Sequence, residues 1–324
     1  MIRTSLVCAF LAILSLASAA QSPAMAGEWR SLASMDRGRS HLAAATVGND
    51  ILVAGGSGLL APLSTFEVYD SNYDYWRPLP NMPEAREQFT LTALGGEAYV
   101  IGGFGEEGRT TPQSSVWIYT HSVSSWREGP AMPIALARHA AVGFDGSVYV
   151  FGGVEEGGAA SDRIFVLAGS GAGWRELSTR MPEPLADMAV AALDGKIYVL
   201  GGRRESGEVT SRVDVFDPET QSWSRAQAMP GARAEHTADA VDGRIHVAGG
   251  IAGNVFQTYA DHFAFDPGGD RWGTVEALRS PRHSLASAVV GDKWYVVGGG
   301  AGAGLFTEFT EADSLEVYDP SGSE

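Results

Sequence analysis

The chain has 324 residues, of which 44% are hydrophobic and 19% are charged, with 41 glycines and a formal net charge of −16. This composition is typical of a folded, turn-rich protein and differs from that of disordered or membrane-spanning chains. The acidic balance argues against nonspecific binding to nucleic acid or to anionic lipid, so neither is expected as a partner.

The first residues have the order of a secretory signal peptide. Arg3 is followed by an apolar stretch from Leu6 to Leu16 and then by small residues that offer cleavage sites. We therefore predict a signal peptide over residues 1–26 and an extracytoplasmic location, either periplasmic or secreted. The apolar stretch is short for a bilayer span, although an uncleaved anchor is the alternative. Cleavage would remove Cys8, the only cysteine, so residues 27–324 would form no disulfide and would not insert into the membrane.

Two features recur along the rest of the chain with one period. Gly-Gly pairs end short apolar runs every 47 to 50 residues, and their first glycines are Gly55, Gly102, Gly152, Gly201, Gly249 and Gly298. A tryptophan recurs at the same intervals, at Trp29, Trp76, Trp126, Trp174, Trp223 and Trp272. Self-similarity with this period indicates a repeat architecture in which each period forms one supersecondary unit.

Each period contains four segments with the character of short strands. In the first period they are predicted over residues 42–47, 51–54, 66–69 and 76–79. Asp-Gly and Gly-Gly dipeptides, which favour tight hairpin turns, separate the first two segments in several repeats. No segment has a convincing apolar period of 3.6 residues, so the chain is predicted to be all-β.

Four segments carry a resemblance to the kelch repeat. They are "VYVFGG" (Val148–Gly153), "IYVLGG" (Ile197–Gly202), "VDVFDPETQSW" (Val213–Trp223) and "AMPGARAEH" (Ala228–His236). The same pattern extends over nearly all of the chain that follows the predicted signal peptide. The resemblance implies a β-propeller, in which each repeat forms a four-stranded blade.

The order of the segments predicts how the propeller closes. The sequence "GEWRSL" (Gly27–Leu32) resembles a fourth strand without the first three, and "LEVYDP" (Leu315–Pro320) resembles a third strand without the fourth. The N-terminal strand is therefore expected to complete the last blade. The predicted fold is an all-β, six-bladed propeller of kelch type that forms one domain over residues 27–324.

The long loops and the starts of the inner strands are predicted to lie on one face, where function usually resides. Two polar positions recur at these strand starts. The first holds Arg39, Arg86, Arg233 and Arg282, and the second holds His41, Gln88, Arg138, Asp187, Glu235 and Ser284. We expect both sets to ring the mouth of the central channel, where arginine suits an anionic ligand. Alternatively, the arginines bond to neighbouring loop carbonyls or to Asp187 and Glu235.

The resemblance implies that ligands and partner peptides bind at this mouth, and three functions stay open. The first is a binding module for a protein segment or an acidic glycan. The second is a sugar mutarotase or epimerase, because sialic-acid mutarotases are also exported, six-bladed and kelch-like; here Glu235, Asp187 and His41 could act as acid–base groups. The third is a structural part of an assembly. A closed pocket holding a carboxyl group of raised pKa would favour the enzyme.

No cofactor and no metal are expected. The seven histidines lack the spacing of metal ligands, and the acidic residues of the long loops are interpreted as a solvated rim. Galactose oxidase also has kelch-like blades, but its copper site requires a cysteine cross-linked to tyrosine. The loss of Cys8 on cleavage would exclude that chemistry here.

Overall fold

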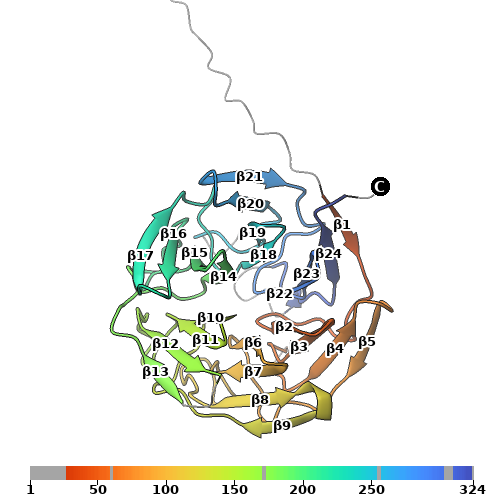
Figure 1. Ribbon diagram of the computed structural model, residues 1–324. Helices are drawn as coiled ribbons and strands as arrows, with labels where there is room; N and C mark the ends of the chain where they lie inside the picture. Colours follow the sequence, from red (N-terminus) through yellow and green to blue (C-terminus); the bar gives the residue numbers. More distant parts are fainter. Residues whose placement is uncertain (1–26, 59–60, 170–172, 254–256, 303–308, 323–324) are drawn as a thin grey trace, which may run out of the picture.

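Six four-stranded antiparallel sheets surround a central axis in the computed structural model (Figure 1). The structure describes residues 27–58, 61–169, 173–253, 257–302 and 309–322. The predicted signal peptide lies outside these residues. Within them, no helix is long and apolar enough to span a membrane. The prediction of an all-β, six-bladed propeller is confirmed.

The strands of each blade follow one another outward from the axis. Blade one holds β2 (Ala43–Val47), β3 (Asp50–Ala54), β4 (Phe66–Asp70) and β5 (Tyr75–Pro78). Blade two holds β6 (Thr90–Leu94), β7 (Glu97–Ile101), β8 (Val116–Thr120), the short helix η1 (His121–Val123) and β9 (Ser125–Glu128). Blade three holds β10 (Ala140–Phe144), β11 (Ser147–Phe151), β12 (Ile164–Ala168) and β13 (Trp174–Glu176).

Blade four holds β14 (Ala189–Leu193), β15 (Lys196–Leu200), β16 (Val213–Asp217) and β17 (Ser222–Ala226). Blade five holds β18 (Thr237–Val241), β19 (Arg244–Ala248), β20 (His262–Asp266) and β21 (Arg271–Val275). Blade six holds β22 (Ala286–Val290), β23 (Lys293–Val297), β24 (Leu315–Asp319) and, at its outer edge, β1 (Glu28–Ser31).

The N-terminal strand closes the propeller, as predicted. β1 pairs antiparallel with β24, in a register that joins Glu28 to Asp319 and Ser31 to Glu316. The two strands lie beside each other at the red and blue ends of the chain in Figure 1. The first and last parts of the sequence therefore form one sheet, so the ring of blades is held together by hydrogen bonds at this point.

The Gly-Gly pairs join each blade to the next. In blade one, the N–H of Gly56 donates to the carbonyl of Arg86 in blade two at 2.9 Å, and the equivalent Gly299 of blade six donates to Arg39 at 2.9 Å. A Cβ atom on Gly55 would lie 2.6 Å from the Arg86 oxygen, and the φ of Gly55 is +53°. Glycine recurs here because only glycine allows both the backbone turn and the close approach.

The repeat tryptophans connect the blades at the outer edge. Five of the six donate the indole N–H to a carbonyl that follows the outer strand of the preceding blade: Trp29 to Glu276, Trp76 to Ala33, Trp126 to Pro80, Trp174 to Pro130 and Trp272 to Gln227, at 2.7–2.9 Å. The sixth, Trp223, has no hydrogen-bond partner for its buried Nε1 among the described residues. The tryptophans thus provide a directional bond in addition to apolar area.

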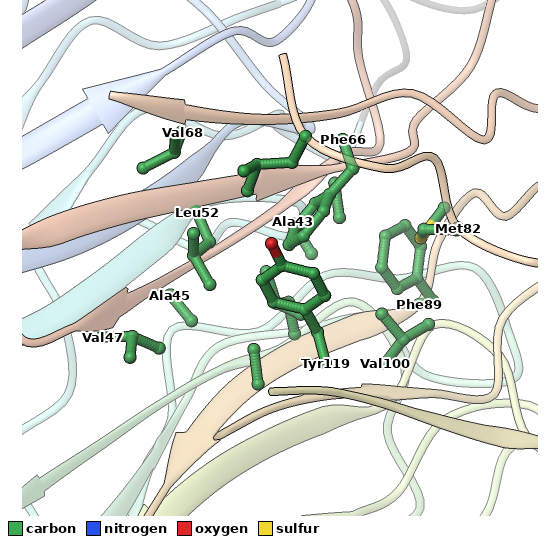
Figure 2. Close-up of a cluster of buried hydrophobic side chains, with 14 residues drawn as sticks. Ala43, Ala45, Val47, Leu52, Phe66, Val68, Met82, Phe89, Val100 and Tyr119 are labelled. Atoms are coloured by element: carbon green, nitrogen blue, oxygen red, sulfur yellow. The ribbon is translucent and has the colours of Figure 1, made fainter. Parts of the chain in front are cut away.

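The core consists of clusters that lie between neighbouring blades. Figure 2 shows the one between blades one and two, where Leu52 and Val68 face Phe89, Val100 and Tyr119. Similar clusters lie at the other blade interfaces. Each blade therefore depends on both of its neighbours for burial of its apolar side chains. Because the core lies between the blades, the loops that join the strands can carry function.

Candidate functional site

Six residues with left-handed backbone form a closed ring around the axis. They share one repeat position, have φ values of 52–56°, and are His41, Gln88, Arg138, Asp187, Glu235 and Ser284. We call them the axial ring. Each backbone N–H donates to the carbonyl of the preceding member at 2.8–3.1 Å, and the bond from His41 to Ser284 closes the circle. Left-handed backbone at six non-glycine residues is costly, and such strain concentrates at functional sites.

On one side of the axial ring, two arginines and two carboxylates alternate. Arg138 donates through Nε to Oδ1 of Asp187 at 2.8 Å and through Nη2 to Oδ2, so the pair is bidentate. Arg203, which follows the Gly-Gly pair of blade four, lies 3.4 Å from both Asp187 Oδ2 and Glu235 Oε1. Burial tends to lower the pKa of Arg138, but the hydrogen bond and the charge of Asp187 raise this pKa above its ordinary value. The arrangement fixes both guanidinium groups in place.

Glu235 lies between two histidines. Its Oε2 is 2.9 Å from His283 Nδ1, 3.7 Å from His41 Nε2, and accepts a 2.6 Å hydrogen bond from Ser284. Burial alone would raise the pKa of Glu235, but the hydrogen bond from His283 and the interaction with His41 hold it well below its usual value. For His283, burial opposes ionisation, yet Glu235 raises its pKa above the ordinary value. Glu235 is therefore a carboxylate at neutral pH.

A further ion pair, between Arg109 and Glu87, lies at the mouth next to blade two. The Nε of Arg109 lies 2.5 Å from Glu87 Oε1, and Ser57 donates to the same carboxylate while it also contacts His41 Nδ1 at 3.2 Å. Burial opposes ionisation of Glu87, but the bonds from Arg109 and Ser57 lower its pKa. Among the residues that the structure describes, the three arginines and three carboxylates named for the mouth form close pairs, so the charges of these six groups balance.

Four of the predicted mouth residues do not line the mouth. Arg39, Arg86, Arg233 and Arg282 are only 0–4% exposed. Each donates through Nη1 to a backbone carbonyl, namely that of Gly55, Ala85, Gly249 and Gly298 respectively, at 2.9–3.1 Å. This corresponds to the structural alternative considered from the sequence. These four arginines precede the inner strands, and their side chains are buried inside the blades by these bonds. Among the predicted arginines only Arg138 reaches the mouth.

Several mouth residues were missed by the sequence interpretation. Arg203 occupies the position directly after a Gly-Gly pair, and the equivalent position in blade one is Ser57. Glu87 and His283 directly precede members of the axial ring. A search of the positions flanking both repeat features would have found these four residues. Arg109 comes from a long loop without a fixed repeat position, so spacing could not identify it.

Two cavities lie at the axis. One, of about 450 Å³, opens beside the axial ring and is lined by Gln88, Phe104, Arg109, Thr110, Arg138, Val154, Glu155, Gly157 and Gly158. We call it the side cavity. The other, of about 370 Å³, is the central channel between the inner strands. Among the described residues, no group of three side chains could hold a metal ion.

The channel contains a carboxyl group of raised pKa. Asp239 on β18 accepts a hydrogen bond from Ser287 and a 2.8 Å bond from Trp294 Nε1. Burial raises its pKa to about 6, against the effect of these two hydrogen bonds. This value lies above the ordinary 3.8, so the folded protein holds the proton more tightly than the unfolded chain does. Ionisation of Asp239 therefore lowers the free energy of unfolding. This loss is complete above about pH 6 and is absent below about pH 4, where Asp239 is protonated in both states.

We expect Asp239→Asn to stabilise the protein at pH 8. The amide oxygen can still accept from Ser287 and Trp294, while the charge is removed. Because channel water screens part of the cost, the free energy of unfolding should rise by about 1–2 kcal/mol at pH 8 and stay unchanged near pH 4. Urea unfolding at the two pH values measures this, with the exposed turn variant Asp242→Asn as the control. A loss of stability at pH 8 would contradict the prediction.

These features define a kelch-type β-propeller with a polar, charge-balanced mouth. The chain belongs to the kelch-repeat family: residues 88–299 match the KLHDC2/KLHL20/DRC7 Kelch-repeats domain, and residues 38–83 match the Kelch motif. The match covers most of the repeats that were predicted from the spacing of glycine and tryptophan. The resemblance drawn from the sequence is thereby confirmed.

Curated relatives match parts of the chain. Kelch-like protein 24 of Rattus norvegicus is 32% identical over 108 residues, which cover 33% of this chain and 16% of that protein. Kelch domain-containing protein 3 of Rattus norvegicus is 27% identical over 113 residues, covering 32% of this chain and 30% of that protein. The matched segments thus span less than a third of these relatives.

The solved structure of YjhT has the same fold. It superposes with a TM-score of 0.76 at 18% sequence identity, over 88% of this chain and 96% of that chain. At this level of identity the likeness concerns the fold alone.

Proposed function

We propose that this protein is an interaction module that recognises a polypeptide segment at the face that carries the axial ring. The closed ring of six left-handed residues is the observation that carries the proposal, because it places a polar residue from every blade around one axis. Kelch propellers commonly bind protein partners. The predicted signal peptide supports export as part of the same proposal, with the binding face acting outside the cytoplasm.

The charge balance of the mouth favours a polypeptide over an acidic glycan. Each of Arg138, Arg203 and Arg109 is already paired with a carboxylate, so an anion would have to displace Asp187, Glu235 or Glu87. A polypeptide offers both donors and acceptors and can bond to the outer edges of these pairs without breaking them. An acidic glycan therefore stands as the second ligand class within the same proposal.

A displayed library of random peptides tests the proposal. Peptides enriched on the wild type should bind Asp187→Asn about ten- to a hundredfold more weakly, because Asp187 positions both Arg138 and Arg203 and a charge-assisted bond is lost. Asparagine tolerates the left-handed backbone, so the fold should be retained.

Asp194→Asn is the matched control, because Asp194 is also left-handed, with a φ of 50°, but lies in an exposed turn between β14 and β15 on the opposite face. Its affinity for the enriched peptides should equal that of the wild type. The proposal fails if no peptide is enriched, or if both variants bind as the wild type does.

A sugar mutarotase at the same mouth is the second candidate, favoured by one observation. Glu235, held as a carboxylate, lies 2.9 Å from His283 and 3.7 Å from His41, which is an arrangement that could move a proton. Exchange between the anomers of sialic acid, followed by NMR, tests this directly. Acceleration by the wild type and its loss in Glu235→Gln would establish the enzyme; an unchanged exchange rate would exclude it.

A further inference from the structure

The side cavity differs in chemistry from the rest of the mouth. Its buried wall is apolar, because Phe104 and Val154 are 3% and 7% exposed and belong to one apolar cluster with Ala137 and Ala186. Phe104 and Val154 both follow a Gly-Gly pair, at the position that holds the charged Arg203 in blade four. The cavity therefore offers a local apolar surface next to the charged part of the mouth.

A fixed guanidinium group forms another wall. The bidentate bond to Asp187 holds Arg138, whose side chain is 27% exposed, in one orientation. A guanidinium plane held in this way can stack on an aromatic ring, and it loses little side-chain entropy when it does so. Arg109, which is bonded to Glu87, also lines the cavity.

The cavity also contains neutral polar groups that are not used by the protein. The side-chain amide of Gln88 and the hydroxyl of Thr110 both line the cavity, and neither makes a hydrogen bond to the described part of the chain. The charged side chains of the lining are paired within the protein, since Glu155 lies 3.4 Å from Arg163. A ligand that fits is therefore uncharged, largely apolar and polar at one end.

We propose that the side cavity binds a tyrosine side chain of the partner polypeptide. The ring would lie between the wall of Phe104 and Val154 and the guanidinium of Arg138, and the phenol hydroxyl would bond to Gln88 or Thr110. A volume of about 450 Å³ accommodates such a side chain together with part of its backbone. Buried tyrosine with a satisfied hydroxyl is a typical anchor of protein interfaces. This inference deepens the proposed function and rests on it.

N-acetyl-L-tyrosine amide is a probe for the cavity alone, and its binding can be followed by NMR. It should bind with a Kd on the order of 1 mM. N-acetyl-L-phenylalanine amide should bind about three- to tenfold more weakly, because it lacks the hydroxyl that Gln88 or Thr110 would bond. Methyl glucoside should not compete; effective competition by this sugar would overturn the assignment to tyrosine.

Two variants localise the probe. The double variant Gln88→Asn with Thr110→Val, which changes both groups that could bond the hydroxyl, should reduce the ratio of the tyrosine to the phenylalanine affinity to about one. Thr110→Trp places a large side chain from the exposed rim into the cavity and should abolish binding of both amides. Asp194→Asn, in the exposed left-handed turn on the opposite face, should change neither affinity. Thermal unfolding checks that all three variants are folded.

The outcomes separate this inference from the proposed function. If the enriched library peptides lack tyrosine and N-acetyl-L-tyrosine amide does not bind, the tyrosine assignment is overturned even though the axial ring can still bind polypeptide. If the amide binds and Thr110→Trp leaves its affinity unchanged, the cavity is not its site. If tyrosine-containing peptides are enriched and bind Thr110→Trp at least tenfold more weakly than the wild type, the result supports both the tyrosine assignment and the proposed function.

Discussion

Replacing Trp29 with alanine is expected to lower the free energy of unfolding by about 3–5 kcal/mol. Trp29 is 2% exposed, and its ring lies 5.4 Å from those of His262 and Tyr318 and 5.7 Å from that of Trp294. Its backbone N–H and its indole N–H both donate to Glu276, at 3.0 and 2.8 Å. The substitution therefore removes the packing and the indole bond that hold β1 in blade six.

Urea unfolding of the purified protein measures this effect, and Arg30→Ala is the control on the same strand. The Arg30 side chain is 51% exposed and its nearest carboxylate oxygens are 3.9 Å away, so its loss should change stability by less than about 0.5 kcal/mol. Deletion of residues 27–31 should cost at least as much as Trp29→Ala, because the edge of β24 also loses its partner. An unchanged unfolding midpoint in the deletion variant would show that β1 does not close the propeller.

The second large effect is expected at a buried ion pair. Arg282 and Glu316 have side chains that are 1% and 3% exposed, and Nη2 of the arginine lies 2.6 Å from Oε1 of the glutamate. Within the described part of the chain, Arg282→Met would leave the buried Glu316 with only the 3.1 Å bond from the Arg279 N–H. A buried charge without its partner is costly, so the free energy of unfolding should fall by about 3–5 kcal/mol.

The double variant Arg282→Met with Glu316→Leu should recover much of this loss, because replacing both charges by apolar side chains removes the uncompensated carboxylate. Arg271→Met is the control, since Arg271 is 75% exposed and pairs with Asp266 at 3.2 Å on the surface. It should change stability by less than about 1 kcal/mol. A double variant that is no more stable than Arg282→Met would show that the ion pair is not the source of the effect.

The fold could be predicted from the sequence because its determinants are local and repeated. Each Gly-Gly pair needs glycine for a backbone turn that touches the next blade, and each repeat tryptophan packs at the outer edge. Because each blade has these requirements, glycine and tryptophan recur at the same spacing in all six repeats. The incomplete repeats at the two ends then predicted the pairing of β1 with β24.

The site could be predicted only in part. The repeat spacing predicted where the axial ring lies, but it did not predict in which direction the side chains next to the ring point. Arg39 and His41 are two residues apart, yet the first is 1% exposed inside the blade while the second contacts Ser57 at the mouth. The left-handed φ of His41 reverses the usual alternation of side chains, and a non-glycine residue in this conformation leaves no clear mark in the sequence.

We propose that Arg138 at the axial ring serves binding, whereas Arg282 inside the blade serves the fold. Measuring the Kd of one enriched peptide against Arg138→Gln and Arg282→Met by titration calorimetry, at a temperature where both variants are folded, tests it most directly. Arg138→Gln should weaken binding by about ten- to a hundredfold and lower stability less than Arg282→Met does, because Arg203 still lies 3.4 Å from the buried Asp187. Arg282→Met should keep the wild-type Kd within about twofold. Equal affinities in Arg138→Gln and the wild type, or a weakened peptide complex in folded Arg282→Met, would contradict the account.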